Sequence, residues 1–157
     1  MVSGVTATRV HDQAFLNGSR IEDTYDLYAQ DADGNVWYLG EDTKQIQNGV
    51  VVGTEGTWEW GVDGALPGII MWSDPAAYQG RDYRQEYYPD NAEDWGRVDS
   101  LGQSVAVPAG SFTGCITTTE WNGLEANSQE AKSYCSGVGL VLTVAGSDRE
   151  ELVSKTP

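Results

Sequence analysis

The stretch from Thr24 to Glu41, TYDLYAQDADGNVWYLGE, is the sequence feature that most restricts what this chain can fold into. Two aromatic-rich runs flank a polar break at residues 31–35. Apolar residues recur at every second position in both runs: Tyr25, Leu27 and Ala29 before the break, Val36 and Tyr38 after it. This period of two is typical of a half-buried strand and would scatter around a helix. Because Asp, Gly and Asn reach positive φ at low cost, the break predicts a tight hairpin.

Two further turn signals divide the first sixty residues. Asn17-Gly18 and Asn48-Gly49 each match the strongest two-residue hairpin signal. Together with the break at residues 31–35, they predict four antiparallel strands in sequence order, at residues 5–15, 20–30, 36–47 and 50–60. The three glycines and one proline of residues 61–68 then predict a loop, because proline cannot donate to a central strand.

The second half of the chain continues as short runs between turn signals. We expect strands at residues 69–72, 83–88, 97–107, 111–121 and 133–145, a terminal edge strand at 150–154, and single helical turns only within 89–97 and 123–132. The pattern of seven to nine strands without a long amphipathic helix is typical of an all-β fold. It predicts an antiparallel meander that forms a strongly curved sheet or an open barrel.

Length and charge restrict the class of protein. A chain of 157 residues predicts one domain, here β-barrel-like and spanning residues 1–157. The 24 acidic and 9 basic residues give a net charge of −15, a field that repels phosphate backbones and anionic lipid heads. We therefore expect no nucleic-acid partner. The apolar run around residues 139–145 is far shorter than the roughly 20 residues of a spanning helix, so we expect no membrane insertion. Residues 1–9 lack the pattern of a signal peptide.

Cys115 and Cys135 are the two cysteines, and each lies in a run predicted as a strand. Cysteines on neighbouring strands can reach the Cα separation that a disulfide needs. A bond closing a loop of about 20 residues would stabilise the fold by roughly 3 kcal/mol and would indicate an oxidising compartment. Two buried free thiols are the alternative.

Five strings carry a family resemblance: YDLYAQDADGNVWYLGEDT, GTWEWGVDGALPGIIM, YRQEYYPDNAEDW, VPAGSF and YCSGVGLV. They resemble segments of a group of uncharacterised secreted or lipoprotein-like bacterial proteins, over residues 4–153. The resemblance implies a curved β-sheet domain with a secreted or cell-envelope location, and no activity. Members of that group carry a further segment before the region that matches Gly4, so one sheet edge is expected to be open here. Cys135 replaces a small residue of their closing motif, which fits a disulfide particular to this chain.

Signatures of covalent and cofactor chemistry are missing from the sequence. His11 is the one histidine, and it has no nucleophile motif beside it, so an exposed strand residue is the favoured interpretation. The chain contains no nucleophile elbow, zinc-protease motif, P-loop or dinucleotide fingerprint. Carboxylates are the remaining candidates for chemistry.

Two acidic groups stand out. Asp31 and Asp33 alternate with Asn35 as calcium ligands do, although the glycine spacing is not that of an EF-hand. A divalent cation such as Ca²⁺ is one interpretation, and turn chemistry is the other. The second group comprises Asp82, Arg84, Glu86, Glu93 and Asp94, which Glu41 or Asp42 could join across the sheet. It predicts either a buried ion pair of Arg84 with Glu86, which share a strand face, that braces the barrel, or a catalytic set of Glu86, Glu93 and Asp94 with a divalent cation that activates water.

Six tryptophans and eight tyrosines are more than one small core requires. Aromatic side chains with polar tips are typical of the opening of a pocket that binds a small molecule. Core packing is the alternative. The residues expected to bind a ligand on the concave side of the sheet are Tyr25, Tyr38, Trp58, Trp60, Tyr83, Arg84 and Tyr87.

Three functions follow as hypotheses. The first is an exported domain that binds a small or lipid-like molecule in an aromatic-lined curved sheet, without catalysis. The second is a divalent-metal-dependent hydrolase that uses the carboxylates. The third is an interaction module in which an open edge strand pairs with another chain or forms a homo-oligomer.

Overall fold

A computed structural model of the chain describes residues 1–125 and 127–156. These residues form thirteen strands and a single short helix, and the strands make two antiparallel sheets. The predicted all-β, antiparallel, curved-sheet fold is confirmed. The structure has thirteen strands where the sequence predicts seven to nine, in part because the predicted runs 50–60, 83–88 and 133–145 are each divided into two strands.

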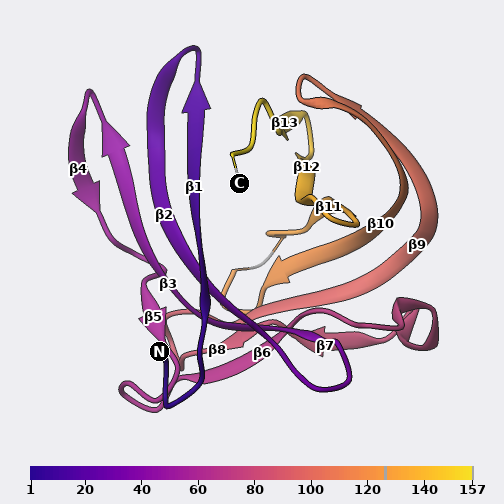
Figure 1. The fold of residues 1–157 in the computed structure, drawn as a ribbon. Helices are drawn as coiled ribbons and strands as arrows, with labels where there is room; N and C mark the ends of the chain where they lie inside the picture. Colours follow the sequence, from indigo (N-terminus) through magenta and orange to yellow (C-terminus); the bar gives the residue numbers. More distant parts are fainter. Residues whose placement is uncertain (126, 157) are drawn as a thin grey trace. The chain divides into compact units, whose positions relative to one another are not determined.

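The strands are numbered in chain order, as in Figure 1. They are β1 (Thr8–Leu16), β2 (Ser19–Gln30), β3 (Val36–Gln47), β4 (Val50–Gly53), β5 (Trp58–Glu59), β6 (Leu66–Met71), β7 (Asp82–Arg84), β8 (Glu86–Tyr87), β9 (Asp94–Val107), β10 (Gly110–Asn122), β11 (Glu130–Cys135), β12 (Gly139–Ala145) and β13 (Asp148–Glu151). The helix is a 3-10 turn, Pro75–Tyr78. Within the part of the chain described, no helix is long and apolar enough to cross a membrane.

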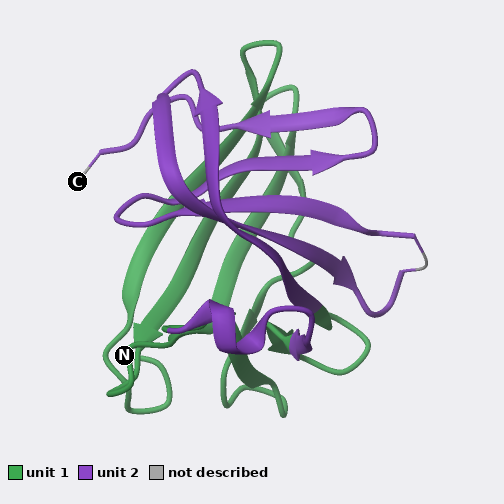
Figure 2. Ribbon diagram, turned by 90° about the vertical axis from the view of Figure 1, so that its right-hand side faces the viewer, with its two compact units in different colours: residues 1–73, 84–94 green, residues 74–83, 95–157 purple. Residues whose placement is uncertain are grey.

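The chain divides into two compact units, coloured green and purple in Figure 2. Unit 1 comprises Met1–Ser73 and Arg84–Asp94 and carries the seven-stranded sheet; unit 2 comprises Asp74–Tyr83 and Trp95–Pro157 and carries most of the six-stranded sheet. The single domain over residues 1–157 stays a prediction.

Unit 1 begins with the predicted meander. Strands β1, β2 and β3 are neighbours in sequence order, and β4 returns along β3. Asn17 and Gly18 have φ of 51° and 80°, and Asn48 and Gly49 have φ of 53° and 77°. Two consecutive positive φ values are what a type I′ turn requires, because its twist matches that of the flanking strands. Both two-residue hairpins predicted from the sequence are confirmed.

The fourth predicted strand, residues 50–60, is wrong as a single element. It is divided into β4 and β5, and both pair with β3. A turn separates them, in which Gly56 has a φ of 94° and the amide of Thr57 donates to the carbonyl of Thr54 at 3.2 Å. The left-handed glycine ends the first ladder, so the chain leaves β3 and returns to it further along.

The predicted loop at residues 61–68 is wrong for its last three residues, because β6 starts at Leu66. In β6, Pro67 pairs with Glu86 of β8, and Gly68 pairs with Tyr38 of β3. A Cβ on Gly68 would lie 2.4 Å from the carbonyl oxygen of Arg84. The glycine that argued against a strand therefore allows two backbone segments to approach closely.

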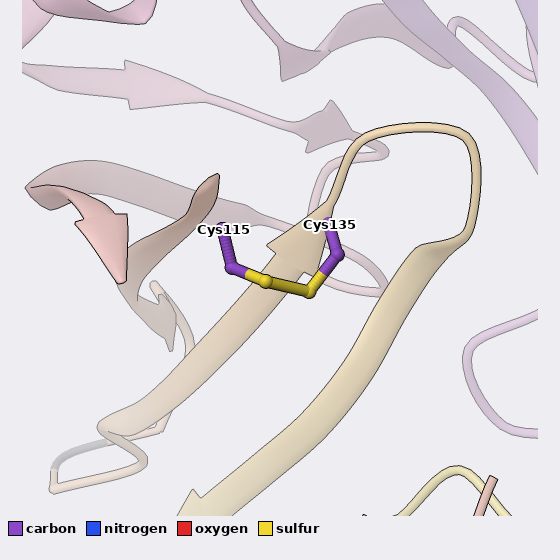
Figure 3. The surroundings of a disulfide bond; sticks show 2 residues. All are labelled: Cys115 and Cys135. Carbon is purple, nitrogen blue, oxygen red and sulfur yellow. A yellow bond between two sulfur atoms is a disulfide. The ribbon is translucent and has the colours of Figure 1, made fainter. Parts of the chain in front are cut away.

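Unit 2 has the strand order β13-β12-β11-β10-β9-β7. Figure 3 shows the disulfide between Cys115 of β10 and Cys135 of β11, whose Cα atoms are 4.2 Å apart. Both cysteines are buried and form the unit's core with Val141. The predicted disulfide is therefore present, and β13 supplies the expected terminal edge strand near residues 150–154.

The two predicted helical turns are wrong. In residues 89–97 the chain makes a bridge between Tyr88 and Ala92 and then enters β9. The amide of Ala92 donates to the carbonyl of Tyr88 at 2.9 Å, and this pairing replaces the helical turn. In residues 123–132, the first three form a turn and the last three belong to β11, while residue 126 lies outside the described residues. The run 83–88 is likewise two short strands, β7 and β8.

Candidate functional site

The Asp31 carboxylate is used within its own hairpin. Its Oδ1 accepts the amides of Asp33 and Asn35 at 3.0 and 2.9 Å, and its Oδ2 accepts Nδ2 of Asn35 at 2.9 Å and Nε1 of Trp37 at 2.8 Å. These donors, Trp37 first, lower the pKa of Asp31 to about 2. The geometry matches turn chemistry. No group of three metal-ligating side chains occurs within residues 1–125 or 127–156, so the calcium site at Asp31 and Asp33 stays a prediction.

The second acidic group contains a bracing ion pair. Arg84 Nη1 lies 3.3 Å from Glu93 Oε2, and its guanidinium lies 4.4 Å from the ring centre of Tyr87. Glu86 is buried, and the carbonyl of Asp94 accepts the amide of Gln85 at 2.8 Å. The described residues contain no metal-ligating group of three, and the catalytic set of Glu86, Glu93 and Asp94 with a divalent cation stays a prediction.

Tyr25 and Tyr38, both predicted to line one hollow, lie on opposite faces of the sheet. Tyr25 stacks on His11 at 4.2 Å between ring centres, and the guanidinium of Arg9 covers its ring at 3.6 Å. Tyr38 instead stacks on Tyr28, at 5.1 Å. Since neighbouring positions of β2 point to opposite faces, residues 25 and 28 are on different sides. His11 is exposed on β1, as expected.

Tyr38 and Trp58 are brought together in the core of unit 1. Their rings meet edge to face at 5.4 Å, a favourable geometry for aromatic pairs. Trp60 packs against the same cluster from a partly buried position. Tyr83 belongs to unit 2, where burial, with Glu120 and Asp99 nearby, raises its pKa. Of the seven predicted ligand-binding residues, three therefore share one cluster.

A bulge in β3 builds an acidic triad beside this aromatic cluster. Leu27 pairs with Gly40 and Tyr28 pairs with Tyr38, so Leu39 is an extra residue in β3. In a regular strand, positions 38 and 41 would point to opposite faces, and the extra residue turns them to the same one. Tyr38 Oη consequently lies 2.5 Å from Glu41 Oε2 and 2.6 Å from Asp26 Oδ1. We call Asp26, Tyr38 and Glu41 the triad.

The carboxyl groups of the triad differ in their electrostatics from exposed carboxylates. Burial, together with the negative charges of Asp26, Glu22 and Asp94, raises the pKa of Glu41 to about 7, and the hydrogen bond from Tyr38 acts in the opposite direction. Burial and the two triad carboxylates likewise raise the pKa of Tyr38 well above its usual value. A carboxyl group that titrates near neutrality in a pocket is a mark of functional sites.

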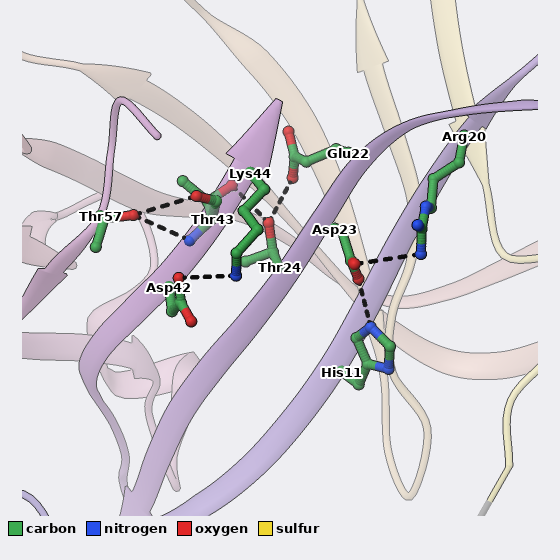
Figure 4. A network of polar contacts seen from close by, with 9 residues as sticks. All are labelled: His11, Arg20, Glu22, Asp23, Thr24, Asp42, Thr43, Lys44 and Thr57. Atoms are coloured by element: carbon green, nitrogen blue, oxygen red, sulfur yellow. Dashed lines mark hydrogen bonds and ion pairs between the residues drawn. The ribbon is translucent and has the colours of Figure 1, made fainter. Parts of the chain in front are cut away.

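Two threonine contacts continue the ladder next to the triad (Figure 4). The hydroxyls of Thr24 and Thr43 are 2.6 Å apart across β2 and β3, and Thr24 also donates to Glu22 at 3.0 Å. Thr57 accepts the amide of Thr43 at 3.1 Å. These contacts hold β2, β3 and the segment before β5 in register, which keeps the triad atoms in place.

An open pocket of about 270 Å³ adjoins the triad. Its walls are Leu27, Glu41, Asp42, Thr57, Trp58, Glu59, Val62, Asp63 and Tyr88. Glu41 of the triad and Trp58, whose ring contacts that of Tyr38, thus both line this pocket. Trp58 is 4% exposed, and its indole Nε1 is buried without a hydrogen-bond partner in the described structure. A buried donor left unpaired costs about 1–3 kcal/mol.

The buried charges of unit 2 are satisfied internally. Glu120 Oε1 accepts from Thr118 at 2.7 Å and from Tyr134 at 2.9 Å, and Oε2 lies 3.2 Å from Lys132. Burial lowers the pKa of Lys132, but Glu120 and Glu130 outweigh it and raise the pKa overall. A buried pair with its hydrogen bonds made is typical of structural bracing.

Searches against models of protein families, curated proteins and solved structures found no match to this chain. The resemblance to exported bacterial β proteins therefore stays a prediction. Sequence reasoning missed Asp26 as a site residue and considered Glu41 only as a residue that could join the second acidic group across the sheet. Gly40 within a strand was the signal that could have found them, since glycine there often marks a bulge.

Proposed function

We propose that unit 1 binds a small organic cation at the pocket that Glu41 and Trp58 line. The observation that carries this proposal is the triad, which places a carboxyl of raised pKa at a pocket wall next to a buried aromatic cluster. The proposal is one of binding and includes no catalytic step.

The composition of the pocket supports a cation over a lipid tail. Four of its nine lining residues are acidic, namely Glu41, Asp42, Glu59 and Asp63. Such a wall concentrates positive charge and disfavours a purely apolar guest. Trp58 and Tyr88 add aromatic surface, which attracts ammonium groups through the ring quadrupole.

Choline and its neutral isostere 3,3-dimethylbutan-1-ol form a matched pair of probes. We expect choline to bind and quench tryptophan fluorescence, and the isostere to bind at least tenfold more weakly, since the two differ chiefly in charge. Glu41→Gln should weaken choline binding, whereas Glu55→Gln, an exposed carboxylate outside the pocket, should leave it unchanged. Equal affinity for both probes, or none for either, would overturn the proposal.

An exported location is part of the proposal. The Cys115–Cys135 disulfide supports it, because disulfides persist in oxidising compartments. Expression in an oxidising and in a reducing bacterial compartment, followed by thiol titration of the unfolded protein, tests whether the bond forms only in the first.

A second candidate function is strand pairing at β1. This strand ends the order of its sheet, and eight of its nine residues are exposed. An edge that shows unpaired backbone groups over nine residues is a template for another chain. A homo-oligomer through β1 would be seen as a concentration-dependent mass in analytical ultracentrifugation, and Val10→Lys should reduce it. A monomer at high concentration would contradict this candidate.

A further inference from the structure

The Tyr38 hydroxyl has one proton but lies within hydrogen-bond distance of two carboxylate oxygens. It can donate to Asp26 Oδ1 at 2.6 Å or to Glu41 Oε2 at 2.5 Å, and not to both along short, straight bonds. With both carboxylates ionised, one of these contacts would bring two oxygen lone pairs together. A single added proton removes the conflict, because a protonated Glu41 can donate to Tyr38 while Tyr38 donates to Asp26.

The groups around Glu41 favour that added proton. On β2 it faces Asp26 and Glu22, and on β9 it faces Asp94, all of them acidic. Trp58 pairs with it on β5, and a Cβ on Gly56 would come within 2.9 Å of its Oε1, so the turn before β5 closes over it. Among the described residues, no lysine or arginine makes an ion pair with Glu41. The neutral form is therefore the one that burial and its neighbours favour.

We propose that the triad holds one proton in the unliganded protein and that the organic cation binds in exchange for it. This inference rests on the proposed function and adds its regulation. The exchange is balanced: the Glu41 O–H bond breaks, its proton leaves to solvent, and the carboxylate charge that remains is met by the ammonium of the ligand. The Tyr38 proton stays on its hydroxyl and is donated to Asp26.

The exchange makes binding depend on pH. Protons compete with the cation below the pKa of Glu41, which is about 7, and cease to compete above it. We therefore expect choline affinity to rise about tenfold between pH 6 and pH 8. Asp42, Glu59 and Asp63 also line the pocket and add to its negative charge.

Calorimetry with choline tests the exchange directly. Choline is a quaternary ammonium with no exchangeable N–H, so protons released near neutrality come from the protein. Titration at pH 6.5 in phosphate and in the zwitterionic buffer ACES, whose ionisation enthalpies differ, should show between one half and one proton released per choline bound. Glu55→Gln should release the same number. Asp26→Asn removes the charge beside Glu41, so the number of protons released per choline bound at pH 6.5 should fall.

An infrared measurement without ligand distinguishes a failure of the proposed binding function from a failure of the proton exchange. The protonated-carboxyl stretch of Glu41 should persist at pH 6, disappear by pH 8.5, and be missing at both in Glu41→Gln. If this band titrates as expected but choline does not bind, the proposed function fails and the exchange fails with it. If choline binds without proton release, or if the band is missing at pH 6, the exchange is overturned and the binding function stands.

Discussion

Asp26 and Glu41 pair directly across β2 and β3, and both contact the same hydroxyl, that of Tyr38. Like charges directly opposite each other destabilise a sheet. This arrangement fits the proposal that the triad retains one proton at neutral pH. Its effect on the stability of the fold can be measured separately from its effect on ligand binding.

Glu41 should make stability depend on pH. Its pKa rises from 4.5 in the unfolded chain to about 7 in the fold, so the folded state binds more protons between these values. The free energy of unfolding should therefore fall as pH rises from 5 to 8, by up to about 3 kcal/mol from this group. Urea denaturation at each pH measures it. Glu41→Gln should flatten the slope relative to Glu55→Gln, and an unchanged slope would contradict the assignment.

Asp31 should act in the opposite direction at acid pH. Its pKa is lowered to about 2, so the stability that its four accepted hydrogen bonds contribute is present above pH 3.8 and is lost as pH falls towards 2. Asp31→Ala should lose stability at neutral pH and show a weaker dependence between pH 4 and 2. Asp33→Ala is the control, because its amide and not its carboxylate makes the turn. Calcium titration should give no heat; binding that requires Asp33 would restore the metal interpretation.

Gly68→Ala should destabilise unit 1. The added methyl would lie 2.4 Å from the Arg84 carbonyl oxygen, and backbone cannot move aside without breaking the β6–β8 pairing. We expect a loss of about 1–3 kcal/mol in chemical denaturation. At Gly53 an added methyl meets only the side chains of Glu55 and Gln45, which can rotate away, so Gly53→Ala should cost less. Equal costs would show that the close approach is unimportant.

Removing the disulfide should destabilise unit 2. The double variant Cys115→Ser and Cys135→Ser frees a loop with a sequence separation of 20 and places two hydroxyls in a buried core. We expect a loss of about 3 kcal/mol or more, compared with the oxidised protein, in guanidinium denaturation. Reduction of the native protein separates the covalent effect from the polar substitution. No change on reduction would mean that the bond contributes little.

Some local elements of this protein could be predicted from its sequence. Asn17-Gly18 and Asn48-Gly49 need only their own φ preferences to form type I′ turns, and the alternation in residues 24–41 needs only the period of a strand. The disulfide between Cys115 and Cys135 could be predicted in a similar way, because the two cysteines lie on neighbouring strands joined by one connection. These interactions act over short chain distances, where the chemistry of each residue is sufficient.

The candidate site was decided by the tertiary structure. A strict alternation places Tyr38 and Glu41 on opposite faces, and the single extra residue Leu39 reverses this. Likewise, Gly68 reads as a strand breaker until the backbone of Arg84 is seen beside it. The side of a strand that a residue occupies depends on the register with strands distant in sequence. Register is selected by packing over the whole sheet, so no local pattern contains it.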